Sequence, residues 1–214
     1  MRRLDPVQRQ HVVLPARMPL ALFTLPSLAA TWLIPRLADL AAQAPQVQLT
    51  LHTGYELHSL PPLQPAVALR VGRFERHGLR LWPLWRDRLV AVASPAWTKL
   101  HGSHPKDWPA GQRLRHLDQA WPCQLAGQRL PPAEGLGFND ALLLVQATLN
   151  GLGVAWTRRA LVAPWLSTGG LLQLAQEPEA ASERSTWLVC RDELADEPAV
   201  RLFVEWLLHQ TICG

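Results

Sequence analysis

Two polar residues stand at predicted helix starts, where they are placed to bind an anion. Ser27 follows the apolar run 20–25 and opens a helix, and Asn139 caps a second helix at 140–149. The first turn of a helix leaves backbone N–H groups without partners, so it attracts carboxylates and phosphates. We interpret these starts as two walls of one ligand site, although both residue types are also ordinary helix caps. Arg70, at a strand end, either adds charge there or is one exposed arginine of several.

The other motifs give no support for catalysis, a metal or a nucleotide cofactor. Gly151 and Gly153 lie between a helix and a strand, whereas a dinucleotide fingerprint needs the opposite order and a third glycine. His101 and His104 lie in a loop, with no third histidine or cysteine at a metal-binding spacing. The sequence contains no nucleophile elbow, H-E-x-x-H pair or Walker loop. We therefore expect no enzyme activity, no catalytic residue, no metal and no cofactor.

Short apolar segments separated by turn residues position these groups. Buried strands are predicted at 20–25, 67–71 and 89–93, and a half-exposed strand with alternating polarity at 47–53. A helix fills the chain between the first strand and 47–53, and Pro35 should kink or restart it. The succession of strand, helix, strand and strand indicates a βαβ unit and a parallel sheet. The predicted fold class is therefore α/β.

Composition limits the class of protein further. The chain has 214 residues, of which 48% are apolar and 18% charged, and this excludes disorder, a coiled coil and a collagen-like repeat. Three cysteines are too few for a disulfide framework, and free thiols in a reducing cytoplasm are the simplest interpretation. The net charge of +4 is carried by scattered arginines. Since DNA binding needs a dense basic face, we expect none from this chain alone.

The longest uncharged stretch, residues 18–35, is a weak candidate for a membrane span or a signal peptide. Three prolines interrupt it, and charged residues such as Asp5 and Arg9 precede it. A bilayer span needs about 20 consecutive apolar residues, and a leader has its apolar region close behind a short basic start. We therefore expect no membrane contact and a cytoplasmic protein.

Eight short segments, in order along the chain, carry a family resemblance. They read PSLAATWLIPRL at 26–37, ALRVG at 68–72, VASPA at 92–96, GFNDA at 137–141, GLGVA at 151–155, RRALV at 158–162, WLVC at 187–190 and DEPAV at 196–200. Together they resemble the effector-binding domain of LysR-type transcriptional regulators, most closely the subgroup of the glycine-cleavage and β-lactamase regulators. The resemblance is collinear from about residue 17 to 210. The family's N-terminal winged helix-turn-helix has no counterpart, because residues 1–16 fit only the end of its linker helix.

The resemblance implies a periplasmic-binding-protein-like fold of type 2, in which two α/β subdomains are joined by two crossover strands. On this chain the crossings would lie near Leu89–Ser94 and Thr186–Arg191. The implied divisions are residues 1–16 for the end of the linker, 17–90 with 191–214 for subdomain I, and 91–190 for subdomain II.

The family's effector lies in the cleft between the subdomains, so the resemblance also implies a set of binding residues. It carries over to Ser27, Thr53, Gly54, Ser94, Phe138, Asn139 and Trp187, and Arg70 is the charged candidate at a strand end. The effector's identity does not carry over. The family's acidic residue before the third strand is Ala66 here, its tyrosine is Val71, and the stretch 54–65 is short and proline-rich.

The function implied is that of a ligand sensor. A small molecule, such as an anionic metabolite or an amino acid, would bind between the subdomains and change their relative angle. The resemblance further implies a homodimer, a tetramer in the full-length form, and DNA contact only through the missing N-terminal domain. The alternative is a periplasmic solute-binding protein of a transport system, which shares this fold.

Overall fold

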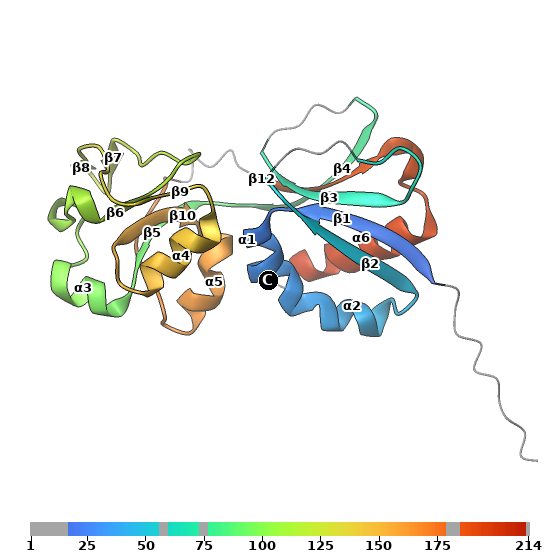
Figure 1. The fold of residues 1–214 in the computed structure, drawn as a ribbon, viewed down its shortest axis with the longest axis horizontal. Coiled ribbons are helices and arrows are strands. Elements are labelled where there is room, and N and C mark those ends of the chain that lie inside the picture. Colours follow the sequence, from blue (N-terminus) through green and yellow to red (C-terminus); the bar gives the residue numbers. More distant parts are fainter. Residues whose placement is uncertain (1–16, 56–59, 73–76, 179–184, 213–214) are drawn as a thin grey trace, which may run out of the picture.

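The computed structural model describes residues 17–55, 60–72, 77–178 and 185–212, and these form two α/β subdomains that lie side by side (Figure 1). Each subdomain is built on one five-stranded sheet. The predicted α/β class is therefore confirmed. The linker predicted at residues 1–16 lies outside the described residues.

The first sheet combines strands from both ends of the chain. Its strand order is β2 (Val47–Thr53), β1 (Met18–Thr24), β3 (Ala66–Val71), β12 (Ser185–Arg191) and β4 (Leu79–Arg86). β1 runs parallel to β2 and β3, whereas β12 is antiparallel to β3 and β4. Parallel pairing in register, up to Thr24 opposite Thr53, brings the carboxyl ends of β1, β2 and β3 to one edge of the sheet.

A single helical segment follows β1 and contains an interruption. It consists of α1 (Pro26–Leu28), the π-helical turn η1 (Ala29–Leu33), the 3₁₀ turn η2 (Ile34–Arg36) and α2 (Leu37–Gln43). Pro35 lies in the 3₁₀ turn, because proline has no N–H to donate and its ring crowds the preceding turn. The predicted restart of the helix at this proline is therefore confirmed.

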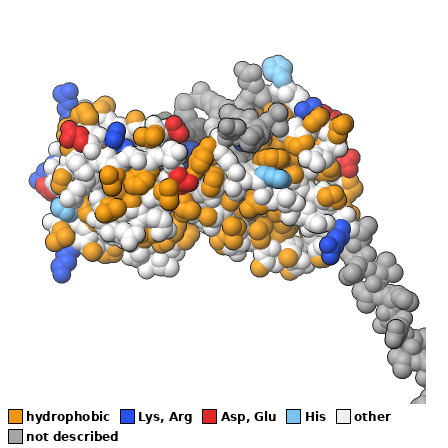
Figure 2. Space-filling model, viewed as in Figure 1, with side chains coloured by type: hydrophobic (Ala, Val, Ile, Leu, Met, Phe, Trp, Pro, Cys, Tyr) orange, Lys and Arg blue, Asp and Glu red, His pale blue; other side chains and the backbone are white. Residues whose placement is uncertain are grey.

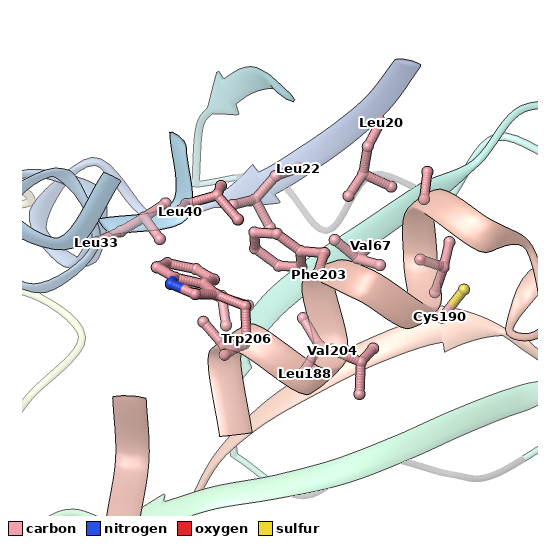
Figure 3. Close-up of a cluster of buried hydrophobic side chains, with 14 of the residues drawn as sticks. Leu20, Leu22, Leu33, Leu40, Val67, Leu188, Cys190, Phe203, Val204 and Trp206 are labelled. Atoms are coloured by element: carbon pink, nitrogen blue, oxygen red, sulfur yellow. The ribbon is translucent and has the colours of Figure 1, made fainter. Parts of the chain in front are cut away.

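The C-terminal helix α6 (Pro198–Ile212) packs with this segment and completes the core of the first subdomain. The side chain of Phe203 is fully buried, in one cluster with Leu22 and Leu188 (Figure 3). Burial of a side chain of this size stabilises the fold by about 2–3 kcal/mol. The indole N–H of Trp206 donates to the carboxylate of Asp39 at 2.8 Å, which joins α6 to α2.

The second sheet has mixed pairing and is covered on both faces. Its strand order is β11 (Leu172–Gln176), β5 (Leu89–Ala93), β10 (Val154–Arg158), β6 (Arg113–His116) and β9 (Gly137–Phe138). All of β5 is buried, because one core cluster that contains Trp97 and Trp156 and another that contains Val90 and Leu144 lie against it.

Helices and short turns complete this subdomain. They are α3 (Pro95–His101), α4 (Ala141–Leu149), α5 (Arg159–Ser167), the 3₁₀ turns η3 (Pro105–Asp107) and η4 (Ala110–Gln112), and the small ribbon of β7 (Gln124–Leu125) and β8 (Gln128–Arg129). A further 3₁₀ turn, η6 (Asp192–Leu194), precedes α6 in the first subdomain. Among the helices of the described ranges, none has the length and apolarity needed to cross a membrane.

The chain passes between the two sheets beside the segments predicted as crossings, and those segments themselves each belong to one sheet. Among the described residues, β5, predicted as part of the crossing near Leu89–Ser94, pairs with strands of the second sheet, and β12, predicted as the crossing Thr186–Arg191, pairs with strands of the first. Both segments are buried and apolar, so their sequences fit a core strand and a crossing equally well. The chain passes between the sheets at Asp87–Arg88 and again after β11. The subdomain boundaries stay a prediction. The strand pairings favour boundaries at Asp87–Arg88 and after β11.

Candidate functional site

A cavity of about 520 Å³ lies at the carboxyl ends of β1, β2 and β3. We call it the strand-end cavity, and it is lined by Phe23–Leu25, Leu51–Tyr55 and Leu69–Val71. The pairing of β1 with β2 continues to the end of β2, where the amide of Gly54 donates to the carbonyl of Thr24 at 3.1 Å. Ligands of open α/β sheets bind at this edge of the strands, because the chain leaves the sheet there and opens a crevice.

The polar groups of the strand-end cavity are suited to an anion. The guanidinium of Arg70 enters from β3, and partial burial lowers its pKa while leaving the group charged. The buried hydroxyl of Thr24 has no hydrogen-bond partner among the described residues. No aspartate or glutamate occurs among the described residues that line this cavity. A carboxylate or phosphate would therefore meet donors from these described residues.

A second cavity, of about 190 Å³, is shared by the two subdomains. We call it the inter-subdomain cavity. Leu25, Ser27 and Tyr55 line it from the first subdomain. The second subdomain contributes Leu89, His116, Asp118, Gln119, Ala141, Trp156, Thr157, Arg158 and Leu161. Because Leu25 and Tyr55 also line the strand-end cavity, the two cavities adjoin.

One hydrogen bond joins the two subdomains beside these cavities. The hydroxyl of Tyr55, just after β2, donates to the carboxylate of Asp140 at the start of α4. Burial opposes the charge of Asp140, but the bonds from Tyr55 and from the amides of Leu143 and Leu142 hold its pKa below the ordinary value. Burial, together with the bond to Asp140, raises the pKa of Tyr55. The tyrosine therefore stays a neutral donor to a charged acceptor, which makes this contact a strong one.

The two predicted helix caps are both displaced by one or two residues. Leu25, not Ser27, is the N-cap of α1, and Pro26 takes the first helical position that suits proline. Asp140, not Asn139, caps α4, since its carboxylate accepts the amides of Leu142 at 2.6 Å and Leu143 at 3.1 Å. Asn139 is exposed. The adjacent Asn and Asp are both good caps, and the apolar run that begins directly after Asp140 is the signal that favours the second.

The structure brings four of the eight predicted site residues to the two cavities. Ser27 lines the inter-subdomain cavity and is only 3% exposed, and Thr53, Gly54 and Arg70 line the strand-end cavity. Whether these residues contact an effector stays a prediction.

The other four predicted residues line neither cavity. Ser94 caps α3 by accepting the amide of Trp97 at 3.3 Å, and Phe138 packs against a core cluster of the second subdomain. Trp187 lies opposite Arg70 on β12, where its indole N–H donates to the carbonyl of Gly72 at 2.9 Å. Asn139 is the fourth. Capping, strand pairing and packing give Ser94, Trp187 and Phe138 structural roles, whereas Asn139 is exposed.

This chain is similar in sequence to a known family of proteins. Residues 15–211 match the LysR substrate binding domain. The chain belongs to this family. The glycine cleavage system transcriptional activator of Escherichia coli K12 is 24% identical over 200 residues, which cover 86% of this chain and 62% of that protein. A transcriptional regulator of Xanthomonas campestris is 36% identical over 160 residues, which cover 69% of this chain and 46% of that protein.

Solved structures agree with the family. The effector domain of the transcriptional regulator AmpR of Pseudomonas aeruginosa superposes with a TM-score of 0.76 at 25% identity, covering 92% of this chain and 97% of that one. The regulatory domain of CrgA from Neisseria meningitidis superposes with a TM-score of 0.77 at 21% identity, and the match covers 91% of this chain and 99% of that one. The predicted periplasmic-binding-protein-like fold of type 2 is confirmed. Because the relatives are transcriptional regulators, they favour the regulatory interpretation over periplasmic transport.

Several residues that line the cavities of this LysR substrate-binding domain were not predicted from the sequence. Tyr55, His116, Trp156 and Arg158 line the inter-subdomain cavity from three segments of the chain, the last two residues lying together on β10. Burial lowers the pKa of His116, and Arg158 lowers it further, while Asp118 and Asp140 partly oppose them. The imidazole is therefore favoured in its neutral form, which both donates and accepts. No local signal marks these residues, since they meet only when the two sheets are placed against each other.

Metal and thiol chemistry have no cluster to support them in the part of the chain that the structure describes. No three His, Cys, Asp or Glu side chains come together there as metal ligands. Cys123 is exposed and Cys190 buried, and both are free thiols. Burial raises the pKa of the Cys190 thiol to about 11, so it behaves as an apolar core side chain.

Proposed function

We propose that this LysR substrate-binding domain binds a small anionic effector across the strand-end and inter-subdomain cavities. The observation that carries the proposal is that two adjoining cavities share Leu25 and Tyr55, and that only one of them reaches the second subdomain. A cavity of about 520 Å³ is within the range of roughly 300–1,000 Å³ usual for small-molecule sites. Arg70 with the hydroxyls of Thr24 and Thr53 supports an anionic ligand.

Binding in this place would change the angle between the subdomains. A ligand shifts a conformational equilibrium only if it binds the two arrangements with different affinity. Groups in the strand-end cavity keep their positions when the subdomains move, because they belong to one sheet. Ser27, on one side of the inter-subdomain cavity, and His116, on the other, change their separation. An effector that reaches both would favour the closed arrangement.

The effect of ligand binding on DNA binding would arise in the full-length protein. The relatives are longer than this chain, which spans 62% of the Escherichia coli activator. We propose that a homodimer, assembled into a tetramer in the full-length cytoplasmic regulator, converts the change of angle into a new spacing of DNA-binding domains. On the face drawn in Figure 2 the basic side chains lie singly rather than in one dense patch, which supports assigning DNA contact to another part of the regulator.

Ligand-dependent thermal stability tests the site. A set of anionic metabolites and amino acids is screened for those that raise the Tm of the chain, since a ligand that binds only the folded state stabilises it. For the best ligand we expect Arg70→Gln to weaken binding about tenfold or more, because a charge-assisted contact is lost.

The matched control is Arg201→Gln on α6, an exposed arginine that lines none of the cavities described above. It should leave both Tm and ligand shift unchanged. An equal ligand shift in wild type, Arg70→Gln and Ser27→Ala would show that the effector does not occupy these cavities. Absence of any effect of a bound ligand on operator binding by the full-length regulator would contradict the signalling step.

A further inference from the structure

A further cavity, of about 570 Å³, lies within the second subdomain beside β6 and the ribbon of β7 and β8 (Figure 1). We call it the outer cavity. Its described lining comes from one stretch of the chain, residues 115–117, 119–123 and 129–133. Asp87 and Arg88, the hinge at which the chain first passes between the sheets, are not part of that lining. A single subdomain therefore forms this cavity, whatever the angle between the two sheets.

Hydrogen bonds to β6 hold the walls of the outer cavity in place. The guanidinium of Arg113, which is fully buried, donates to the carbonyls of Pro131 at 2.7 Å and Pro132 at 3.2 Å. In another part of the wall, the indole N–H of Trp121 donates to the carbonyl of Leu114 at 2.8 Å. Because both parts are bound to the same strand, the cavity is formed before a ligand enters. Little binding energy would be lost in ordering the site.

The charged side chains in the described lining of the outer cavity are both positive. They are Arg115 and Arg129, and both are exposed. The Nε–H of Arg115 donates to the carbonyl of Gly135 at 2.9 Å, which orients the guanidinium and leaves four N–H groups. The acids nearest in the sequence, Asp118 and Glu134, are not among the described residues that line the cavity. The charge that this cavity favours is therefore negative.

Most of the remaining wall is apolar. It consists of Leu117, Ala120, Trp121, Pro122, Leu130, Pro131, Pro132 and Ala133. Trp121 is supported from within the subdomain by ring contacts with Trp156 at 5.8 Å and Trp108 at 6.1 Å, measured between centroids. An apolar wall with a few convergent cations suits a ligand that has an apolar body and one anionic group.

One turn of the chain separates the outer cavity from the inter-subdomain cavity. His116 and Gln119 line both cavities. The amide of Gln119 donates to the carbonyl of His116 at 3.1 Å, and the amide of Asp118 donates to its Nδ1 at 3.2 Å. Because the turn 116–119 is a wall of both cavities, a ligand on its outer side would also order the groups on its inner side.

We propose that the outer cavity is a ligand site of the second subdomain, which binds a small amphipathic anion. Its carboxylate or phosphate pairs with Arg115 and Arg129, and its alkyl chain packs on Trp121 and the neighbouring prolines. Occupation orders the turn 116–119 and acts through it on the inter-subdomain cavity. The ligand binds independently of the anion proposed for the strand-end cavity, because the described linings of these two cavities have no residue in common.

Simple probes test the chemistry of the site. Hexanoate and hexyl phosphate carry the two anionic groups on one chain, butanoate shortens the chain, hexanamide removes the charge, and inorganic phosphate removes the chain. Affinity is measured by titration calorimetry at constant ionic strength. We expect hexanoate, hexyl phosphate or both to bind, and affinity to rise about two- to fourfold per methylene from butanoate to hexanoate. The proposal fails if neither binds, if hexanamide binds as tightly as hexanoate, or if inorganic phosphate matches hexyl phosphate.

The thiol of Cys123 reports where the probe binds, because it is exposed and lines the outer cavity. A bound probe should slow its reaction with iodoacetamide about fivefold or more, followed by mass spectrometry of the peptide that contains Cys123. Hydrogen exchange should slow at the amides of the turn 116–119 and stay unchanged in β1 and β2. An unchanged labelling rate with bound probe would place the ligand elsewhere and overturn the proposal.

Variants separate the outer cavity from the strand-end cavity. Arg129→Gln should weaken probe binding about fivefold or more, while the Tm without ligand stays unchanged because the side chain is exposed. Arg201→Gln, the matched control on α6, and Arg70→Gln should both keep the wild-type affinity. Equal affinity of Arg129→Gln and wild type would contradict the assignment. Loss of binding in Arg70→Gln alone would place the probe in the strand-end cavity and would also overturn it.

Discussion

The strand-end cavity and the inter-subdomain cavity share two residues but are built in different ways. Every residue of the first belongs to the ends of β1, β2 and β3 and the loops that follow them, within one sheet. The second is closed by β10, α4 and α5 of the other subdomain. The strand-end cavity exists as soon as the first sheet forms. The inter-subdomain cavity exists only in one relative placement of the two sheets.

This difference suggests separate roles for the two cavities, one in ligand recognition and the other in the change of angle between the subdomains. Under the proposed function, Arg70 and Thr24 would hold an anion whatever the angle between the subdomains, and would set which ligand binds. The groups of the inter-subdomain cavity, Ser27 and His116 on its two sides, would then set which conformation the ligand favours. Changes in the second subdomain should therefore affect the switch while leaving the recognition groups in place.

The largest expected effect comes from crowding the second sheet. A Cβ added to Gly153, just before β10, would lie 2.1 Å from the carbonyl oxygen of Gln112, and backbone cannot move aside cheaply. We expect Gly153→Ala to destabilise the second subdomain by roughly 2–4 kcal/mol, because overpacking forces main chain apart. Hydrogen exchange should then show lost protection in β5 and β10 with β1 unaffected.

The control lies in the same subdomain. A Cβ at Gly111 meets no atom within 4 Å, so Gly111→Ala should leave protection in both sheets unchanged. Equal loss of protection in β1 and β10 of the Gly153→Ala variant would contradict the independence of the two subdomains, and with it the independence of the strand-end cavity.

The same contrast explains how far the sequence could be interpreted. Buried strands and a proline-broken helix are local features, and the apolar runs at 20–25 and 67–71 predict β1 and β3 correctly. Of the predicted site residues in the cavities, Thr53 and Gly54 come from the family resemblance, which places them at the end of a predicted strand. Ser94 caps α3 and lines neither cavity, and a serine before proline at a helix start has the same pattern as a cap and as a ligand contact.

Local sequence patterns do not show which residues far apart in the chain come into contact. Nothing near Tyr55 in the chain indicates that its hydroxyl meets Asp140, 85 residues later. The apolar character of β5 and β12 likewise predicts burial but not which sheet each strand joins.

A smaller effect is expected from the bond that joins the two subdomains. Tyr55→Phe keeps the ring that lines both cavities and removes only the donor to Asp140. Loss of one hydrogen bond costs about 0.5–1.5 kcal/mol, so effector affinity should fall roughly two- to tenfold through a less populated closed form. Titration of the effector by tryptophan fluorescence measures it. If affinity is unchanged while Arg70→Gln weakens binding, recognition does not depend on closure and the proposed coupling is wrong.

The smallest effects are the pH dependences of two carboxylates that accept backbone N–H groups at helix starts of the second subdomain, Asp140 at α4 and Asp87 at α5. The pKa of Asp140 is lowered from 3.8, so its charged form stabilises the folded state above that value and the contribution is lost as the pH falls through the lowered pKa. Burial raises the pKa of Asp87 above 3.8, although bonds from Ala160 and Arg88 oppose it. Its folded form binds protons more tightly, so stability falls as the pH rises from 3.8 through the raised pKa.

Comparison of Tm between about pH 3 and about pH 6 separates the two groups, because their windows lie on opposite sides of the ordinary value. The Tm of wild type minus that of Asp140→Asn should increase with pH in the lower part of the range. The Tm of wild type minus that of Asp87→Asn should decrease with pH in the upper part. The same sign for both differences would mean that Asp87 is solvated like Asp140, and the hinge would then be open to water instead of closed around its carboxylate.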